Sequence, residues 1–404
     1  MSLLDHLQAK LDAIASQSLT RTLRVAETGT APRQTLNGRE LLMFCANDYL
    51  GLAAEPAIAD ALAEGARRWG GGSGASPLVS GHSAAHHAVT DTLARWYEPH
   101  IPQARALGFC TGYMANLAVV TALGDEHTEL FSEQLNHASL IDAARLAKAR
   151  VTRYPHGDLV ALRAALAAST AKVRVIVSDA VFSMDGVLAP VPELLALAEA
   201  FDAWLIVDDA HGFGVLGDTG RGTLEHFGLC SERLILVGTL GKAAGLAGAF
   251  VVAHATIVDY LVQAARNFIF STASPPAIEH ALLTSLALID GPVGTQRRAQ
   301  WRRLLAQLRA GLLALVARHP ALGWQVPEVA TPIQPLIIGG NAEVMALAAR
   351  LEADGIRVPG IRPPTVAAGT ARLRITLCGT HTEADVQQLL DALEAAATEL
   401  EARA

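Results

Sequence analysis

Residues 204–242 read WLIVDDAHGFGVLGDTGRGTLEHFGLCSERLILVGTLGK. This segment contains two apolar runs of strand length, WLIVDD (204–209) and LILVGT (234–239). Polar or glycine residues come soon after each run. Apolar strands that alternate with helices are typical of a mostly parallel sheet covered on both faces. Similar runs elsewhere are RALGFC (105–110), TELF (128–131), VTRY (151–154), VRVIVSD (173–179) and GAFVVA (248–253), and helical patterns separate several of them.

The length of the chain indicates more than one domain. It has 404 residues, and a single hydrophobic core stops growing at roughly 250–300 residues. The strand–helix pattern changes near residue 275, where helical stretches follow, and shorter strand candidates come after them, PLIIGG (335–340) and ARLRITLC (371–378). We therefore predict an N-terminal helical segment over 1–40, a large α/β domain over 41–280 and a small α+β domain over 281–404.

Helical spacing and capping signals mark several helices. Thr382 and Asp385 form a capping-box pattern, which predicts a final helix that starts after Thr382. A first helix is predicted from Leu3, Leu4, Leu7, Leu11 and Ile14, and a later apolar stripe consists of Trp301, Leu304, Leu305, Leu308 and Leu312.

Composition excludes several classes of protein. Lys plus Arg number 32 and Asp plus Glu number 39, a net charge of −7, and no basic block suggests a nucleic-acid surface. The four cysteines form no CxxC pair, which excludes a disulfide scaffold or a cysteine-built zinc site and favours a reducing cytoplasm. The longest apolar run, 243–253, is too short to span a bilayer. We expect a cytoplasmic protein without nucleic-acid, membrane or metal partners.

Ligands bind beyond the carboxyl ends of the strands in open α/β sheets, so the residues that follow each strand are candidates. Gly112 and Tyr113 open a helix after the strand 105–110, and free N–H groups at a helix start suit a phosphate. A simple tight turn is the alternative. His137 follows the strand 128–131 at another helix start, where a capping or core histidine is the alternative.

Titratable residues follow the strands 204–209 and 234–239. Asp208 and His211 stand three positions apart; helix capping by Asp208 or Asp209 is the alternative, and a metal site is weakly supported without further ligands. Lys242 is followed by eleven uncharged residues, so desolvation is expected to lower its pKa and make the amine nucleophilic. A lysine that reaches solvent is the alternative. A P-loop is excluded because Leu236 and Ala243 break its pattern.

Together, these strand ends carry what pyridoxal phosphate needs. The phosphate requires a helix N-terminus, the pyridine nitrogen a carboxylate, and the aldehyde a lysine amine. No single feature indicates this cofactor, but the combination does.

Five motifs carry a resemblance to a known family: FCANDYLGLA (44–53), GSGASPLVSGH (72–82), VFSMDG (181–186), VDDAHGFGVLG (207–217) and TLGKAAG (239–245). The chain resembles the α-oxoamine synthases, fold-type I pyridoxal-phosphate enzymes, over nearly its full length. The resemblance implies an aspartate-aminotransferase-like α/β fold with a mostly parallel seven-stranded sheet domain and a small α+β domain.

The stretch IRPPTVAAGTARLRITL (361–377) is similar to the branch of the family that acts in biotin biosynthesis. This likeness implies an acyltransferase that condenses L-alanine with a pimeloyl thioester of coenzyme A or acyl carrier protein, with loss of CO₂. The alternative is a sibling enzyme, such as glycine C-acetyltransferase or 5-aminolevulinate synthase.

The resemblance also implies roles for single residues. Lys242 would form the Schiff base with the cofactor, Asp208 would pair with the pyridine nitrogen, and His137 would stack on the ring and contact substrate. Lys242, His137, Asp208 and His211 are the implied catalytic residues. The remaining implied residues are His211 and Ser183 near the ring hydroxyl, Gly112, Tyr113 and Thr239 at the phosphate, Asn47 and Arg362 near the amino-acid carboxylate, and Thr365 near the acyl group.

Two further implications concern the partner subunit and the N-terminus. Ser271 and Thr272 match the segment that reaches the partner's phosphate in a homodimer with shared active sites. Family members carry an N-terminal arginine for the distal pimeloyl carboxylate, but Thr20 stands at that place here. Arg21 is therefore our candidate and Arg24 the reserve.

Overall fold

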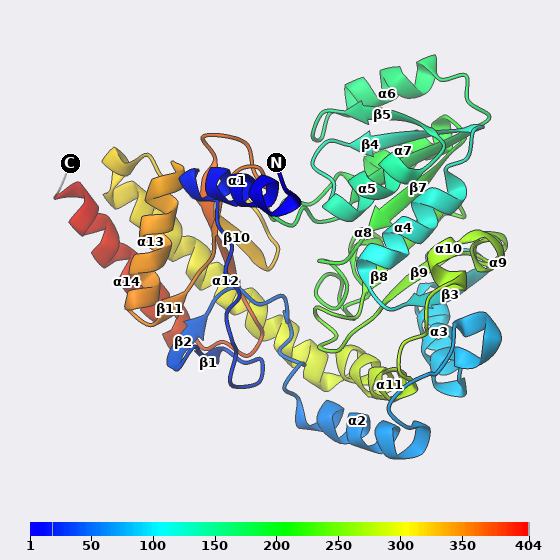
Figure 1. Ribbon diagram of the computed structural model, residues 1–404, viewed down its shortest axis with the longest axis horizontal. Coiled ribbons are helices and arrows are strands. Elements are labelled where there is room, and N and C mark those ends of the chain that lie inside the picture. Colours follow the sequence, from blue (N-terminus) through cyan, green and yellow to red (C-terminus); the bar gives the residue numbers. More distant parts are fainter. Residues whose placement is uncertain (18, 403–404) are drawn as a thin grey trace.

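The computed structural model describes residues 1–17 and 19–402. Its largest sheet has seven strands, and Figure 1 shows helices on both of its faces. The strand order is β3-β9-β8-β7-β6-β4-β5, and every pair is parallel except the two that involve β9. All seven strands predicted from the sequence are confirmed. Their bounds are β3 (Ala104–Phe109), β4 (Thr128–Glu133), β5 (Arg150–Tyr154), β6 (Val173–Asp179), β7 (Ala203–Asp208), β8 (Leu234–Thr239) and β9 (Ala249–His254).

Both faces of this sheet are buried, which explains why its strands are apolar without alternation. Leu205 and Val207 belong to one apolar cluster, and Ile206 between them belongs to the other. The helices on the Leu205 side are α2 (Pro56–Trp69), α3 (Ala84–Tyr97), α6 (Leu159–Ala168), α7 (Val191–Ala200), α8 (Thr223–Phe227) and α11 (Pro276–Asp290); those on the Ile206 side are α4 (Gly112–Leu123), α5 (Ala138–Leu146), α9 (Ala255–Ala264) and α10 (Arg266–Ile269).

The smaller part of the molecule combines residues after 290 with two strands from the N-terminal segment, and it contains two three-stranded sheets flanked by long helices. One sheet has the order β1-β2-β11, and the other has the order β10-β13-β12. The strands are β1 (Arg33–Leu36), β2 (Arg39–Met43), β10 (Ile333–Gly339), β11 (Ile356–Arg357), β12 (Gly360–Ile361) and β13 (Ala371–Thr376); the helices are α12 (Pro292–Arg318), α13 (Asn341–Ala353) and α14 (Glu383–Glu401). The predicted capping box at Thr382 is confirmed, as is the buried stripe of α12.

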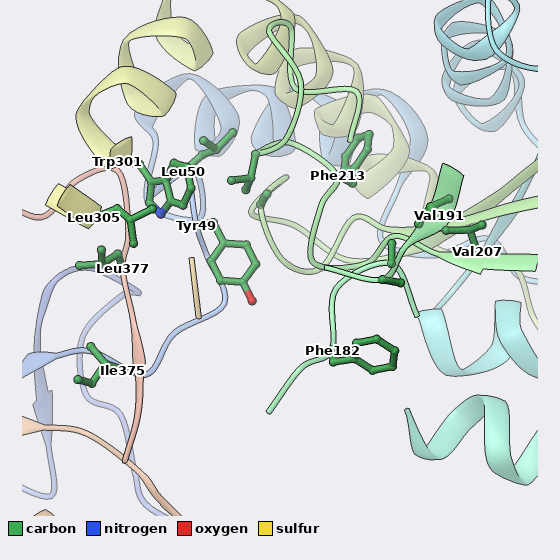
Figure 2. Packing of buried hydrophobic residues seen from close by; sticks show 14 of the residues in the cluster. Tyr49, Leu50, Phe182, Val191, Val207, Phe213, Trp301, Leu305, Ile375 and Leu377 are labelled. Carbon is green, nitrogen blue, oxygen red and sulfur yellow. The ribbon is translucent and has the colours of Figure 1, made fainter. Parts of the chain in front are cut away.

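A single apolar cluster joins the two parts of the molecule. Figure 2 shows Tyr49 near Trp301 and Leu305 of α12, with Phe213 of the sheet domain beyond it. The segment 44–53 thus lies at the junction and faces the strand ends. The domain boundaries at 40 and 280 stay predictions.

The first predicted helix is confirmed as α1 (Leu3–Ser16), and none of its side chains is buried. Within residues 1–17 and 19–402, no helix is long and apolar enough to cross a membrane.

Candidate active site

Lys242 lies in the turn between β8 and β9, at the carboxyl end of the sheet. Its Nζ atom is 2.9 Å from Nε2 of His211. Burial lowers the pKa of Lys242 to about 8, even though the carboxylates of Asp208 and Asp179 act to raise it. Lys242 lines a cavity of ≈ 420 Å³ together with Asn47. The expected desolvated lysine is therefore present in the structure.

A chain of polar side chains holds His211 in place. Nδ1 of His211 is 2.5 Å from the Tyr49 hydroxyl, which donates to Oδ1 of Asn47 at 3.1 Å. Because that hydroxyl gives its proton to Asn47, its oxygen accepts from His211 Nδ1, and Nε2 accepts from Lys242. Burial and the Lys242 ammonium hold the pKa of His211 well below its usual value. His211 is thus a neutral acceptor for the lysine.

Asp208 is the last residue of β7, and its carboxylate is buried. Oδ1 accepts from the main-chain N–H of Ala210 at 2.9 Å, and Oδ2 accepts from Asn116 Nδ2 at 2.5 Å. The capping alternative applies to Asp209, whose Oδ2 accepts from the main-chain N–H of Thr223, the first residue of α8, at 2.7 Å, and not to Asp208. The neighbouring strand ends in Asp179, which is paired in register with Asp208. This strand end therefore carries a buried carboxylate, and no cationic side chain among residues 1–17 and 19–402 forms an ion pair with it.

His137 is the N-cap of α5, so the capping alternative is correct for its Nδ1 atom. Its main-chain N–H donates to Asp179 Oδ2 at 2.6 Å, and its ring stays exposed. Partial burial and the Lys242 ammonium lower the pKa of His137, although Asp208 acts in the opposite direction. The exposed ring and capped Nδ1 leave the rest of the imidazole available to a ligand.

The proposed phosphate residues meet at the start of α4. Gly112 is the first residue of this helix, and a Cβ atom there would lie 3.8 Å from Oγ1 of Thr239. Thr239 is buried, and its hydroxyl accepts from Gly241 N at 3.2 Å. Tyr113 is 45% exposed, and its hydroxyl donates to Asp142 at 2.5 Å. Gly112 and Thr239 are thus brought together, whereas the Tyr113 hydroxyl is engaged on the surface.

Ser271 and Thr272 follow α10 and line a cavity of ≈ 260 Å³ that also includes Cys110. Cys110 stands two positions before Gly112, and its Sγ donates to the Thr272 carbonyl at 3.5 Å. Within a single subunit, Ser271 and Thr272 therefore lie near the start of α4. Ser183 lies after β6, and its carbonyl accepts from Arg374 Nε at 2.6 Å.

Arg374 is a site residue that our sequence reasoning did not select. It is 6% exposed, its Nη2 is 3.3 Å from Asn47 Oδ1, and its charge helps to lower the pKa values of Lys242 and His211. None of the ion pairs among the described residues includes Arg374. A signal existed in the sequence, because Arg372 and Arg374 lie on one face of an otherwise apolar strand. Arg372 differs in that it pairs with Asp185.

Arg362 and Thr365 lie in the connection from β12 to β13. Thr365 N donates to the Arg362 carbonyl at 3.1 Å, and the Thr365 side chain is exposed. The place of Arg362 near the amino-acid carboxylate stays a prediction, and Arg374 joins it as a second candidate because it contacts Asn47.

The N-terminal arginines have different surroundings. Arg24 forms an ion pair with Glu352 of α13, which also pairs with Arg357. Arg21 and Thr20 are exposed, and Arg21 belongs to none of the ion pairs in the described part of the chain.

These residues fit pyridoxal phosphate. A twelve-residue helix begins at a glycine, where a Cβ atom would be in ordinary contact with Thr239, and a buried carboxylate and a desolvated lysine stand on strand ends nearby. A helix N-terminus suits the phosphate, the carboxylate suits a protonated pyridine nitrogen, and the lysine suits an aldehyde. Among residues 1–17 and 19–402, no cluster of three or more His, Cys, Asp or Glu could hold a metal ion.

Comparison with known proteins agrees with this geometry. Residues 39–393 match the family model described as aminotransferase class I and II. The 8-amino-7-oxononanoate synthase 2 of Polaromonas sp. (strain JS666) is 60% identical, over 98% of this chain and 100% of that protein. The 8-amino-7-oxononanoate synthase of Cupriavidus metallidurans is 61% identical, over 98% of each chain. The chain belongs to the 8-amino-7-oxononanoate synthase family.

Solved structures agree with this family and its fold. A structure of SPT with a PLP internal aldimine has a TM-score of 0.90 and 27% identity, and the match covers 99% of this chain and 100% of that one. A crystal structure of 8-amino-7-oxononanoate synthase from Francisella tularensis has a TM-score of 0.73 and 29% identity, over 90% and 98% of the two chains. The expected fold-type I class and the expected cofactor are confirmed.

Proposed function

We propose that the chain catalyses the synthesis of 8-amino-7-oxononanoate from L-alanine and a pimeloyl thioester. The alanine Cα atom loses its proton and bonds to the thioester carbonyl carbon, and the carbon–sulfur bond breaks to release a thiol. The alanine carboxyl group then leaves as CO₂, and Cα takes up a proton. The observation that carries the proposal is the Lys242–His211 contact beside Asp208, in a chain about 60% identical to synthases named for this product.

Pyridoxal phosphate, when bound, supplies an aldehyde that bonds amines and a protonated ring that accepts the electron pair of Cα. Asp208 would hold the proton on the ring nitrogen, and His137 would pack against the ring face. His211 and Ser183 would face the ring hydroxyl. The residues that would hold the phosphate are Gly112, Tyr113 and Thr239, at the N-terminus of α4 and the end of β8.

Lys242 moves the Cα proton. With its pKa lowered to about 8 by burial, a useful fraction of the amine is neutral near pH 7 and accepts a proton. His211 Nε2 accepts a hydrogen bond from Nζ and keeps the amine at the strand end. The chemistry therefore needs both residues in the arrangement described.

Arg374 and Asn47 bind the alanine carboxylate. The Arg374 guanidinium is buried without an acidic partner in the described part of the chain, and a buried charge needs a counter-charge. A carboxylate supplies that charge, and a guanidinium binds its two oxygens with parallel hydrogen bonds. Arg21 is our proposed partner for the distal pimeloyl carboxylate, and Thr365 would contact the acyl chain.

We further propose a cytoplasmic homodimer in which Ser271 and Thr272 contribute to the partner's phosphate site. All four cysteines are free, which suits a reducing compartment.

Product analysis tests the proposed function. The purified protein with pyridoxal phosphate, L-alanine and pimeloyl-coenzyme A should release CO₂ and 8-amino-7-oxononanoate, identified by mass. Lys242→Ala should abolish the product, and Lys148→Ala, at an exposed lysine, should not. Glycine with acetyl- or succinyl-coenzyme A should react poorly. A faster reaction with glycine would instead identify one of the sibling synthases.

A further inference from the structure

Asn116 joins three parts of the candidate site that are distant in the sequence. It belongs to α4 and is 1% exposed. Its Nδ2 atom is 2.5 Å from Asp208 Oδ2 and 2.9 Å from Ser139 Oγ. Ser139 Oγ is 2.7 Å from His137 Nδ1. The side chains of Asp208, Asn116, Ser139 and His137 therefore form one continuous hydrogen-bonded chain, which we call the Asn116 relay.

We propose that Asn116 is a positioning residue that couples Asp208 to His137 through the Ser139 hydroxyl and holds the His137 imidazole as the tautomer protonated on Nε2. This inference rests on the proposed function for its use in catalysis, but the relay itself concerns only residues of this chain.

The direction of each hydrogen bond follows from what each group can donate. The Asp208 carboxylate only accepts, so the Asn116 group that faces it is the NH₂. The second proton of that NH₂ goes to Ser139 Oγ, which leaves the Ser139 proton for Nδ1 of His137. The main-chain N–H of Ser139 points to the same Nδ1 at 3.3 Å. Nδ1 is thus an acceptor, and the ring proton of neutral His137 resides on Nε2.

The surroundings keep this ring neutral and fixed. The Lys242 ammonium and partial burial lower the pKa of His137. Asp179 holds the His137 main-chain N–H, so the residue is anchored on both sides. None of the hydrogen bonds among residues 1–17 and 19–402 involves His137 Nε2. The Nε2–H group of His137 is therefore free to donate to an acceptor atom of a bound ligand, such as a carbonyl oxygen on which negative charge develops.

A purely structural role does not explain the amide at this position. Oδ1 of Asn116 is buried and has no hydrogen-bond partner within the described part of the chain. A buried acceptor without a partner is costly, and an apolar side chain of similar size would avoid that cost. The compensating gain is the pair of N–H donors of the amide, which bind Asp208 and Ser139.

Two measurements on the holoenzyme test the relay. Imidazole ¹⁵N shifts of histidine-labelled protein, with His137 assigned by loss of its signal in His137→Gln, report the tautomer. Equilibrium titration with pyridoxal phosphate reports cofactor affinity. In the wild-type protein, His137 should be protonated on Nε2; a proton on Nδ1 would overturn the proposal.

The variants separate the Asn116–Asp208 contact from the contacts that link Asn116 through Ser139 to His137. Asn116→Ala should shift the His137 signals and weaken cofactor affinity by about tenfold, because Asp208 loses a charge-assisted hydrogen bond. Ser139→Ala should shift the His137 signals and leave the affinity unchanged, and Ser139→Thr should keep the wild-type signals. Asn267→Ala is the matched control, because Asn267 also contacts α4, through the Met114 carbonyl at 2.6 Å, and also has a buried Oδ1 without a partner. It should change neither quantity.

The outcomes distinguish the relay from the proposed function. If Asn116→Ala and Ser139→Ala both leave the His137 signals unchanged, the relay is wrong, even in a protein that makes 8-amino-7-oxononanoate. If the signals respond as expected in a protein that binds the cofactor but makes another product, the relay stands and the proposed function is wrong. If Asn116→Ala does not fold, the two Ser139 variants decide.

Discussion

The Tyr49 hydroxyl lies 2.5 Å from Nδ1 of His211, although the two residues are 162 positions apart. This contact turns Nε2 of His211 toward Lys242 as an acceptor. The junction between the two parts of the molecule, from which Tyr49 comes, therefore sets the surroundings of the lysine on the sheet. The chemistry of Lys242 is consequently the first property to measure.

Attachment of pyridoxal phosphate to the apoprotein should accelerate as the pH rises through about 8. Only a neutral amine attacks an aldehyde, and burial lowers the pKa of Lys242 to about 8. Stopped-flow recording of the visible absorbance across pH gives the midpoint. Lys148→Ala should show the same profile. A midpoint near 10.5, the ordinary value for lysine, would mean that the lysine is solvated.

Asp208→Asn should retain the cofactor but lose at least about a hundredfold in product formation, because a neutral amide does not hold a proton on the ring nitrogen. The same change should lower the attachment midpoint, since the Asp208 carboxylate raises the pKa of Lys242. Turnover and the absorbance profile measure the two effects. Asp202→Asn, at the exposed opposite end of β7, is the control, and full turnover of the Asp208→Asn variant would contradict the assigned role of Asp208.

Arg374→Gln should raise the KM for L-alanine about tenfold to a hundredfold, as expected when a charge-assisted hydrogen bond of about 1.5–3 kcal/mol is lost. Arg362→Ala should change this KM much less, because the buried Arg374 guanidinium contacts Asn47. Steady-state kinetics with alanine varied gives both values. The reverse order would return the carboxylate to Arg362, as the family resemblance implies.

Arg21→Ala should raise the KM for the pimeloyl thioester about tenfold to a hundredfold and leave alanine binding unaltered. Arg24→Ala should leave that KM unchanged, since Arg24 already pairs with Glu352. Kinetics at saturating alanine measures both variants. An effect of Arg24→Ala alone would place the distal carboxylate three residues further along the chain.

Mixing the inactive variants Lys242→Ala and Thr272→Ala should restore part of the activity, because one site of each mixed dimer would hold both intact residues. Mixed dimers are verified by differential tagging. Since Thr272 already lies beside Cys110 of its own chain, verified mixed dimers without activity would show that Thr272 acts within its own subunit.

The sequence by itself determined the seven strands, the flanking helices and the residues at the strand ends. Lys242, Asp208, His137 and Gly112 were found this way because each depends on a local pattern, an apolar run followed by a turn. Parallel strands then bring their carboxyl ends to one edge of the sheet, so residues chosen one strand at a time lie close together.

Only the tertiary structure decided which side chains bond to these residues. Asn116 contacts Asp208 across 92 positions, Tyr49 contacts His211 across 162, and Arg374 contacts Asn47 across 327. No periodicity or spacing in the sequence encodes such pairs, because they arise where separate elements pack. The burial that lowers the pKa of Lys242 and the hydrogen bonds that orient His137 and His211 are therefore properties of the assembled fold.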